Sequence, residues 1–226
     1  MKIKTKILAI SLTLVVLVTT IITFALLTFE TETLTNTFTV GQVSLKLDEA
    51  DVDENGTPIE GADRVTGNNY KLIPGKKYVK DPTMTVLSGS EDSYVRLLVT
   101  LTKAKELKEI FGENFLPENY VTGWDKNKWI STNIKENEDN TITYEFRYYK
   151  IVNGKVEDKE QDVVLEPLFT QFTAPTKLTG TDLKTIEGFE IKVIGHAIQA
   201  VGFKDADEAW NAFDAEIDGN NEQGGE

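Results

Sequence analysis

The feature that most constrains this chain is an uncharged, largely apolar run of 23 residues, Ile7–Phe29, placed directly after three early lysines. A run of this length can cross a bilayer as a helix, and a basic start followed by an apolar run is typical of a secretory signal. The positive end stays cytoplasmic, so the rest of the chain faces outward. We therefore expect residues 1–27 to be a signal peptide or an uncleaved membrane anchor.

The end of this run sets the expected start of the mature protein. Cleavage requires small residues near the boundary, and Ala25 is an acceptable match. We expect a signal peptidase to cut after Ala25 or within the next three residues, Leu26, Leu27 and Thr28. Contact with a membrane would then be limited to residues 7–29 before cleavage, and the protein would be secreted to the cell surface or extracellular matrix.

The charge and the cysteine count exclude several classes of function. Lys and Arg total 24 against 37 Asp and Glu, which gives a net charge of −13. Phosphate backbones and anionic lipids both require basic protein surfaces, so neither nucleic acid nor an anionic membrane surface is an expected partner. The chain has no cysteine, which excludes disulfides, thiol nucleophiles and cysteine-ligated zinc. Stability must come from core burial and sheet pairing.

Short segments of alternating apolar and polar residues dominate the exported part and predict strands. In Ser93–Thr102 the apolar residues at every second position indicate a half-buried strand. The segment Phe29–Leu47 is rich in Thr and Val, and a change of parity at Gly41 predicts a bulge. Further strands are expected at 76–81, 83–87, 141–152, 155–158, 163–173 and 188–201.

Helical spacing is limited to three places. Lys103–Phe111 predicts a short helix, and Thr181–Thr185 predicts one helical turn. Asp205 and Glu208 have the spacing of a capping box before an amphipathic helix that carries Trp210, Phe213 and Ile217. The predicted fold is all-β: a jelly-roll-like antiparallel β-sandwich with a few short peripheral helices, preceded by an N-terminal signal or transmembrane helix. We expect one domain over residues 28–218 and a polar acidic tail over 219–226.

Catalytic chemistry finds little support in the residues. His196 is the only histidine, and it lies in an apolar strand. Neither an HExxH zinc motif nor a GxSxG nucleophile elbow is present. We therefore predict no catalytic residue and no cofactor, and we interpret His196 as a buried residue that bonds a backbone carbonyl.

One acidic stretch has the start of a calcium-binding loop. Asp51, Asp53 and Asn55, followed by Gly56, match the first half of the loop pattern. The pattern requires Glu at its twelfth position, where Ala62 stands, and no flanking helices are predicted. These three residues are a weak calcium candidate, and no other metal site is predicted.

Aromatic residues gather in the middle of the chain. Trp124 and Trp129 fall in an expected loop, and an aromatic row follows in an expected strand: Tyr144, Phe146 and Tyr148 on one face, and then Tyr149. Such residues can form a ligand-binding platform, but more often they pack the core of a sandwich. We favour the core interpretation.

The segment directly behind the signal is β-prone and can join a sheet edge. If its own domain leaves this strand loose, main-chain hydrogen bonds can hold it on a neighbouring subunit. Repetition of such a head-to-tail contact does not close, so it produces a filament of identical subunits. The strand can equally pair within its own chain. The residues of the expected donor strand are Phe29, Thr31, Thr33, Leu34 and Thr35.

An ordered set of short motifs resembles the TasA/camelysin family. It follows the basic start and long apolar run, and it extends over nearly the whole chain. The matching segments are Leu34–Gly41 (LTNTFTVG), Tyr70–Gly75 (YKLIPG), Lys80–Thr83 (KDPT), Ser90–Arg96 (SEDSYVR), Pro167–Thr170 (PLFT), Gly195–Ala200 (GHAIQA) and Ala209–Trp210.

This resemblance implies a secreted protein of Gram-positive bacteria with a jelly-roll domain and a SipW-type signal peptide. TasA-like members are subunits of biofilm matrix fibres, in which the N-terminal strand of one subunit completes the sheet of the next. The implied partners are other copies of the chain and other matrix proteins. Two alternatives stay open: a camelysin-type cell-surface metallopeptidase, although no zinc motif is recognisable, and a monomeric surface-binding module.

Overall fold

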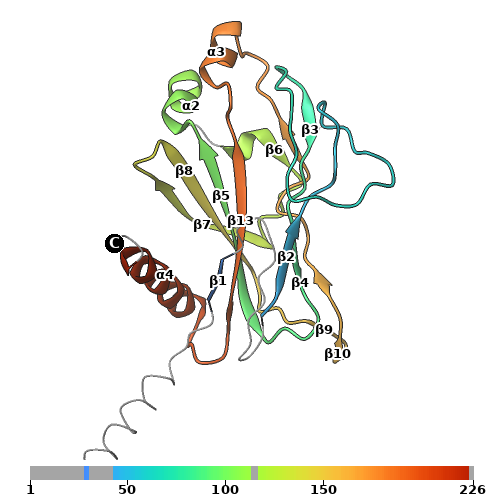
Figure 1. Cartoon of the computed structure of the whole chain (residues 1–226), viewed down its shortest axis with the longest axis vertical. Helices are drawn as coiled ribbons and strands as arrows, with labels where there is room; N and C mark the ends of the chain where they lie inside the picture. The colour runs from blue at the N-terminus through green and yellow to red at the C-terminus, as the bar shows by residue number, and fades with distance from the viewer. Residues whose placement is uncertain (1–27, 31–42, 113–116, 224–226) are drawn as a thin grey trace, which may run out of the picture.

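The computed structural model describes residues 28–30, 43–112 and 117–223 (Figure 1). The expected signal segment, the cleavage residues Ala25, Leu26 and Leu27, and the expected bulge at Gly41 lie outside these residues. None of the described helices is both long and apolar enough to cross a membrane.

The largest element is a five-stranded sheet, called here the main sheet. Its strands lie in the order β1-β13-β5-β8-β7, and every neighbouring pair is antiparallel. The strands are β1 (Thr28–Glu30), β13 (Ile191–Gln199), β5 (Ser93–Thr102), β8 (Thr141–Tyr148) and β7 (Trp129–Glu136).

The strand alternation predicted for 93–102 is confirmed and gives the main sheet its inner face. Leu97 of β5 pairs with Phe146 of β8 on one side and with Gly195 of β13 on the other. Opposed residues of antiparallel strands share a face, so the side chains of Leu97 and Phe146 lie in one row, and Gly195 leaves the β13 position of that row without a side chain. Leu97 is fully buried in this row.

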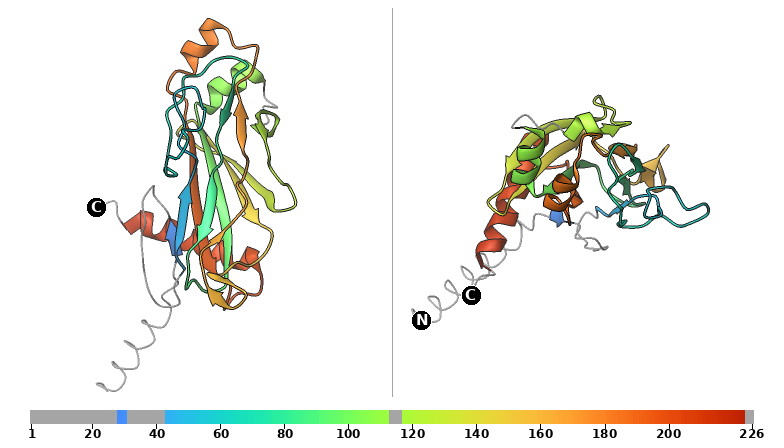
Figure 2. Two further views of the ribbon diagram at one scale, coloured as in Figure 1. Left: turned by 90° about the vertical axis from the view of Figure 1, so that its right-hand side faces the viewer. Right: turned by 90° about the horizontal axis from the view of Figure 1, so that it is seen from above.

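A second layer of shorter strands covers this inner face (Figure 2). Two three-stranded sheets form it, in the orders β11-β4-β2 and β3-β12-β6, and a separate β9-β10 hairpin lies beside them. The core between the layers contains Met84, Val86, Leu168 and Trp129, each almost fully buried. The strands are β2 (Leu45–Asp48), β3 (Lys77–Val79), β4 (Thr83–Val86), β6 (Val121–Thr122), β9 (Lys155–Val156), β10 (Lys159–Glu160), β11 (Val163–Val164) and β12 (Gln171–Thr173).

The two layers approach most closely where β13 crosses β4. A Cβ atom placed on Gly195 would lie only 1.8 Å from Cε of Met84. The missing side chain therefore makes room for Met84, whose side chain is completely buried. Glycine at this point allows close packing of one layer on the other.

Short helices lie at the ends of the sandwich, and one longer helix covers the outer face of the main sheet (Figure 1). The helices are α2 (Ala104–Phe111), the 3-10 turn η2 (Pro117–Tyr120), α3 (Gly180–Thr185) and α4 (Ala206–Gln223). The cap predicted for α4 is present, because Asp205 accepts a hydrogen bond from the backbone N–H of Glu208. Trp210 and Phe213 of α4 pack on Ile198 of β13. This helix continues to Gln223, into the segment expected to be a polar tail.

Two predictions about strands are wrong. The expected loop around Trp129 is the eight-residue strand β7. The single strand expected at 163–173 is two strands in different sheets, since β11 pairs with β4 while β12 pairs with β3 and β6. Pro167 lies between them and cannot donate a main-chain hydrogen bond, which ends the ladder there.

An apolar cavity of about 120 Å3 lies between the layers among the described residues. Residues from both layers line it, including Val99, Tyr144, Phe146, Phe172 and Ile186. The core interpretation of the aromatic row is confirmed for Tyr144 and Tyr148, which are buried, and is wrong for Tyr149, which is 46% exposed.

Candidate functional site

The edge strand β13 is only partly covered by β1. Thr28 pairs with Ile198, Phe29 with Ala197 and Glu30 with His196. The other side of β13 pairs with β5 along its whole length. Over residues 191–194, none of the described strands pairs with β13 on the side of β1.

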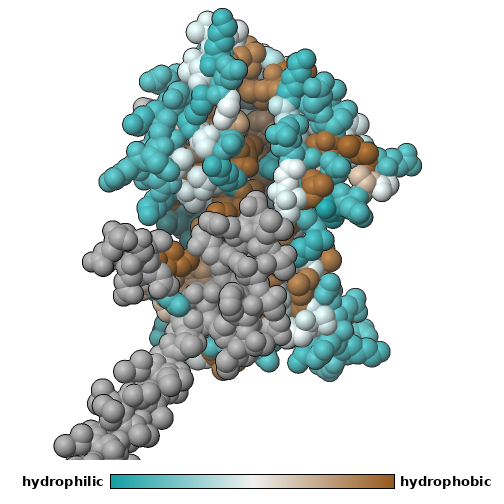
Figure 3. Space-filling model, in the orientation of Figure 1, coloured by the Kyte–Doolittle hydropathy of each residue, from teal (hydrophilic) through white to brown (hydrophobic). Residues whose placement is uncertain are grey.

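A groove of about 1080 Å3 runs along this open edge. β13 forms one wall, and β2, the edge strand of the opposing β11-β4-β2 sheet, forms part of the other. Figure 3 shows brown, apolar side chains along the hollow, with teal, polar residues on both flanks. The apolar residues that line the groove include Leu45, Leu47, Leu72, Phe172, Ile191 and Val193.

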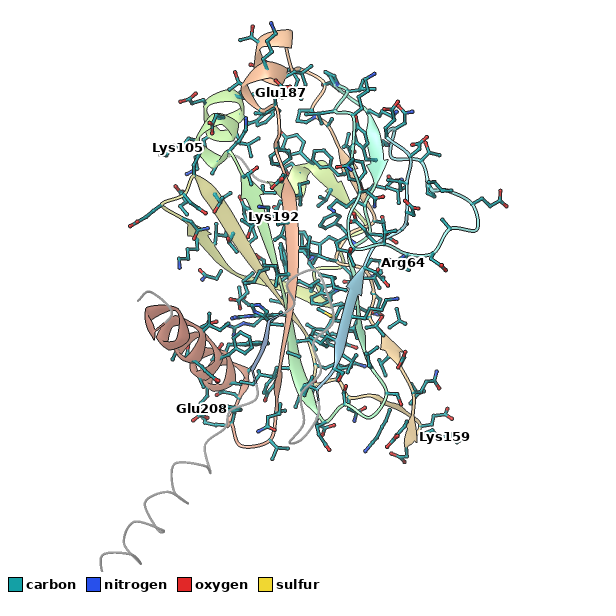
Figure 4. The ribbon with its side chains drawn as sticks, viewed as in Figure 1. Arg64, Lys105, Lys159, Glu187, Lys192 and Glu208 are labelled. Carbon is teal, nitrogen blue, oxygen red and sulfur yellow. The ribbon has the colours of Figure 1, made fainter. Side chains whose placement is uncertain are left out.

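Charged side chains stand on the two rims of the groove. Figure 4 shows Lys192 on β13 and Arg64 on the far side, beyond β2. Arg64 donates to Asp48 at 2.6 Å and to Asp81 at 2.9 Å. Burial acts to lower the pKa of Arg64, but its hydrogen bonds to Asp81 and Asp48 outweigh that effect and raise it. The rim that carries Arg64 is therefore held in place by a network of ion pairs.

Below the open edge, His196 lies opposite Glu30 of β1 and is buried, with 2% of its surface exposed. Its Nδ1 accepts a hydrogen bond from Nε of Arg96 at 3.2 Å, so the partner is a side chain and the predicted backbone carbonyl is wrong. Burial, together with the positive charge of Arg96, lowers the pKa of His196 to about 3. His196 is therefore neutral at pH 7, with its proton on Nε2.

Arg96 connects this part of β13 to α4. Its guanidinium donates to both carboxylate oxygens of Asp214 and lies 4.4 Å from the ring centre of Trp210 and 4.9 Å from that of Phe213. Glu145 of β8 lies 3.5 Å away on the other side. A guanidinium between aromatic faces and carboxylates is well compensated for its burial. The part of β13 that pairs with β1 is therefore held in place by Arg96 and α4.

The structure places only some of the predicted donor-strand residues. Phe29 belongs to β1, which pairs with β13, and Thr28, a residue of the expected cleavage region, lies in the same strand. Thr31, Thr33, Leu34 and Thr35 lie outside the described residues.

The weak calcium candidate is occupied by internal hydrogen bonds. Oδ1 of Asp53 accepts the backbone N–H groups of Asn55 and Thr57 at 2.9 Å, and Nζ of Lys76 donates to Oδ1 of Asn55 at 2.8 Å. The backbone carbonyl of Asp51 accepts from Ile59. Across the described part of the chain, no three acidic or histidine side chains converge as a metal ion would require.

Sequence reasoning did not find the groove itself. Alternation indicates which residues face the core, but it does not indicate which strand lies at the edge of a sheet. The order β1-β13-β5 depends on pairings between residues about a hundred positions apart, such as His196 with Arg96. No local pattern carries that information.

Comparison of this chain with protein-family models, curated proteins and solved structures found no match.

Proposed function

We propose that this chain is an exported structural subunit of extracellular matrix fibres, which assembles when the N-terminal strand of one subunit occupies the open edge of β13 in the next. The observation that carries the proposal is that the described pairing of β1 with β13 spans three residues, while residues 191–194 of β13 line an apolar groove. An uncovered edge is a template for strand addition. The resemblance to the TasA/camelysin family and the jelly-roll class it implies form part of the same proposal.

The register of β1 gives the proposed contact a definite geometry. Glu30 lies opposite His196 in an antiparallel pair. If a donated strand keeps this register, Leu34 stands opposite Lys192 and Thr35 opposite Ile191. The predicted donor strand is then just long enough to cover β13 to its first residue. Alternate side chains would point into the apolar groove, as strand addition requires.

Deletion of the strand is the direct test of assembly. We expect mature protein that starts at Leu26 to form filaments and protein that starts at Thr37 to stay monomeric, as seen by electron microscopy and sedimentation. Main-chain pairing cannot form without the strand. If both forms sediment as monomers, the fibre proposal fails and a monomeric surface-binding module is the better interpretation.

Cysteine cross-linking distinguishes donation from self-pairing, because the natural chain has no cysteine. We expect a mixture of two single variants, Leu34→Cys and Lys192→Cys, to form a disulfide-linked dimer under mild oxidation. Lys105→Cys, on helix α2 and away from the groove, replaces Lys192→Cys in the matched control (Figure 4). If only the doubly substituted chain cross-links, and does so within one molecule, the strand serves its own domain.

A further inference from the structure

A Lys–Glu–Asn cluster, in which Lys80 and Glu49 are buried and Asn68 is half-buried, lies in the wall of the groove opposite β13. Glu49 follows β2, and Lys80 precedes β4; only 4% of Glu49 and 8% of Lys80 are exposed. Asn68 belongs to the long loop between β2 and β3. This loop is folded back on Glu49 by a bridge in which Glu49 and Val65 exchange two 2.8 Å hydrogen bonds.

The carboxylate of Glu49 contacts both other members of the cluster. Its Oε2 accepts from Nζ of Lys80 at 2.6 Å, and its Oε1 accepts from Nδ2 of Asn68 at 2.9 Å. The amine of Lys80 and the carboxamide of Asn68 therefore each donate a hydrogen bond to a different oxygen of the buried Glu49 carboxylate. The ring of Tyr70, whose centre is 6.0 Å from Nζ, forms a wall beside the amine.

The amide of Asn68 is held in a single orientation. Its Nδ2 also donates to the carbonyl of Ala50 at 2.9 Å, and its Oδ1 accepts the backbone N–H of Val52 at 3.0 Å. A backbone N–H on this oxygen polarises the C=O bond. It would also stabilise the negative charge that develops there if a nucleophile attacked the carbon.

We propose that Lys80 and Asn68 become joined by an amide bond, which the chain forms by itself with Glu49 as the acid–base group. A proton passes from Nζ of Lys80 to Glu49 along their hydrogen bond. The neutral amine attacks Cγ of Asn68, and the new Nζ–Cγ bond forms while the Cγ–Nδ2 bond breaks. Glu49 gives this proton to the departing nitrogen and takes one from the attacking nitrogen, and ammonia leaves and carries that last proton away as ammonium. No oxidant or other reactant is consumed.

Burial favours this reaction for a physical reason. Two opposite charges away from water carry a desolvation cost, and the proton transfer from Lys80 to Glu49 removes both charges. The same carboxyl group contacts both the attacking and the leaving nitrogen, which removes most of the entropic cost of bringing them together. The product ties the long loop to the start of β4 by a covalent link, in a chain that has no cysteine with which to do so. This inference does not rest on the proposed fibre function.

The mass of the full-length protein, measured under denaturing conditions, tests the proposal. We expect a mass lower than that of the linear chain by about 17 Da, the loss of one ammonia. Trypsin should then release residues 65–71 covalently attached to residues 78–96, because the acylated Lys80 is no longer cleaved. A full linear mass, with the two peptides separate, would overturn the proposal.

Variants exclude a different loss of ammonia, the cyclisation of an asparagine on its own backbone. Lys80→Arg keeps the positive charge but cannot form the amide, and Glu49→Gln cannot carry the proton, so both should show the full linear mass. Asn69→Ala removes the neighbouring exposed amide and should keep the reduced mass. A reduced mass that persists in Lys80→Arg would assign the loss to cyclisation. If a variant fails to fold, the mass of the unaltered protein and of its tryptic peptides still tests whether the amide bond forms.

Discussion

At the scale of single residues, Gly195 is a position where an added side chain would meet the second layer. A Cβ atom there would overlap Met84, which is completely buried between the layers. We expect Gly195→Ala to lower the free energy of unfolding by about 1–3 kcal/mol through overpacking. Urea denaturation of the purified domain measures the change.

A second substitution provides the control for this prediction. Met84→Leu removes the terminal methyl group that would clash, and alone it should cost less than about 1.5 kcal/mol. The double variant should then lose less unfolding free energy than the two single variants lose together, because the two residues are in contact. Strict additivity would show that the cost of Gly195→Ala has another source.

His196 predicts a specific dependence of stability on pH. Its folded pKa of about 3 lies below the ordinary value of 6.5, so below pH 6.5 the unfolded chain binds a proton that the folded chain does not. The contribution of His196 to the free energy of unfolding is fully present above pH 6.5 and decreases as the pH falls toward 3. The loss approaches about 1.4 kcal/mol per pH unit. Denaturant unfolding at pH 7, 6, 5 and 4 measures it.

Comparison with His196→Gln separates this effect from the titration of carboxylates. The groups that surround the imidazole are Arg96, which bonds it, Asp214, which pairs with that arginine, and the ring of Phe213. Carboxylates with lowered pKa values, such as Glu166 at about 2, also lose stabilising charge in acid, and they remain in the variant. We expect a shallower pH slope in His196→Gln between pH 6.5 and 5. An equal slope would contradict the assignment.

At the scale of elements, α4 contributes stability mainly through two aromatic residues. Trp210 is 1% exposed, contacts Phe213 and lies over the guanidinium of Arg96. We expect Trp210→Ala to cost about 3–5 kcal/mol in unfolding free energy, because it leaves a large cavity beside a buried charge. Asn211→Ala, on the exposed side of the same helix, should change stability by less than about 0.5 kcal/mol. Similar effects of both would show that α4 is not docked on the sheet.

The elements also show what local sequence can predict. The strand predicted at 93–102 has the same bounds as β5, because its alternation is regular and its inner face fully apolar. In β7 the pattern fails: Ile130 and Ile134 are exposed, and a register shift between Ser131 and Asn133 changes the parity midway. A mostly solvent-exposed strand with a bulge has no two-residue periodicity, so it was expected to be a loop.

The candidate site was predictable only in part. The β-prone segment at Phe29 indicates a strand, and β1 is one. The length of its pairing and the identity of its neighbour depend on long-range contacts. The cluster of Lys80, Glu49 and Asn68 depends on how a long loop folds back, which propensity does not determine.

At the scale of the whole molecule, the charge of −13 predicts how the proposed assembly responds to salt. Identical acidic subunits repel each other, and salt shortens the range of that repulsion to about 8 Å at 0.15 M. We expect filament growth to be faster in 150 mM than in 10 mM sodium chloride. Light scattering of the mature protein follows the rate.

The control uses calcium at matched ionic strength. Because Asp53 and Asn55 are engaged by backbone groups and by Lys76, we expect calcium to accelerate growth no more than magnesium does. If calcium accelerated growth much more than magnesium does, the calcium loop would again be a candidate for a specific binding site. Faster growth at low salt would contradict repulsion as the controlling force.

The apolar cavity between the layers has a consequence for the molecule under hydrostatic pressure. Unfolding abolishes an internal void, and water then packs around the groups that lined it, so the system occupies less volume. Volume changes of about −20 to −100 mL/mol are usual for proteins, and voids are a main source of them. The cavity of about 120 Å3 that Tyr144 and Phe172 help to line is one such space between the layers, so we expect pressure to favour unfolding of this chain.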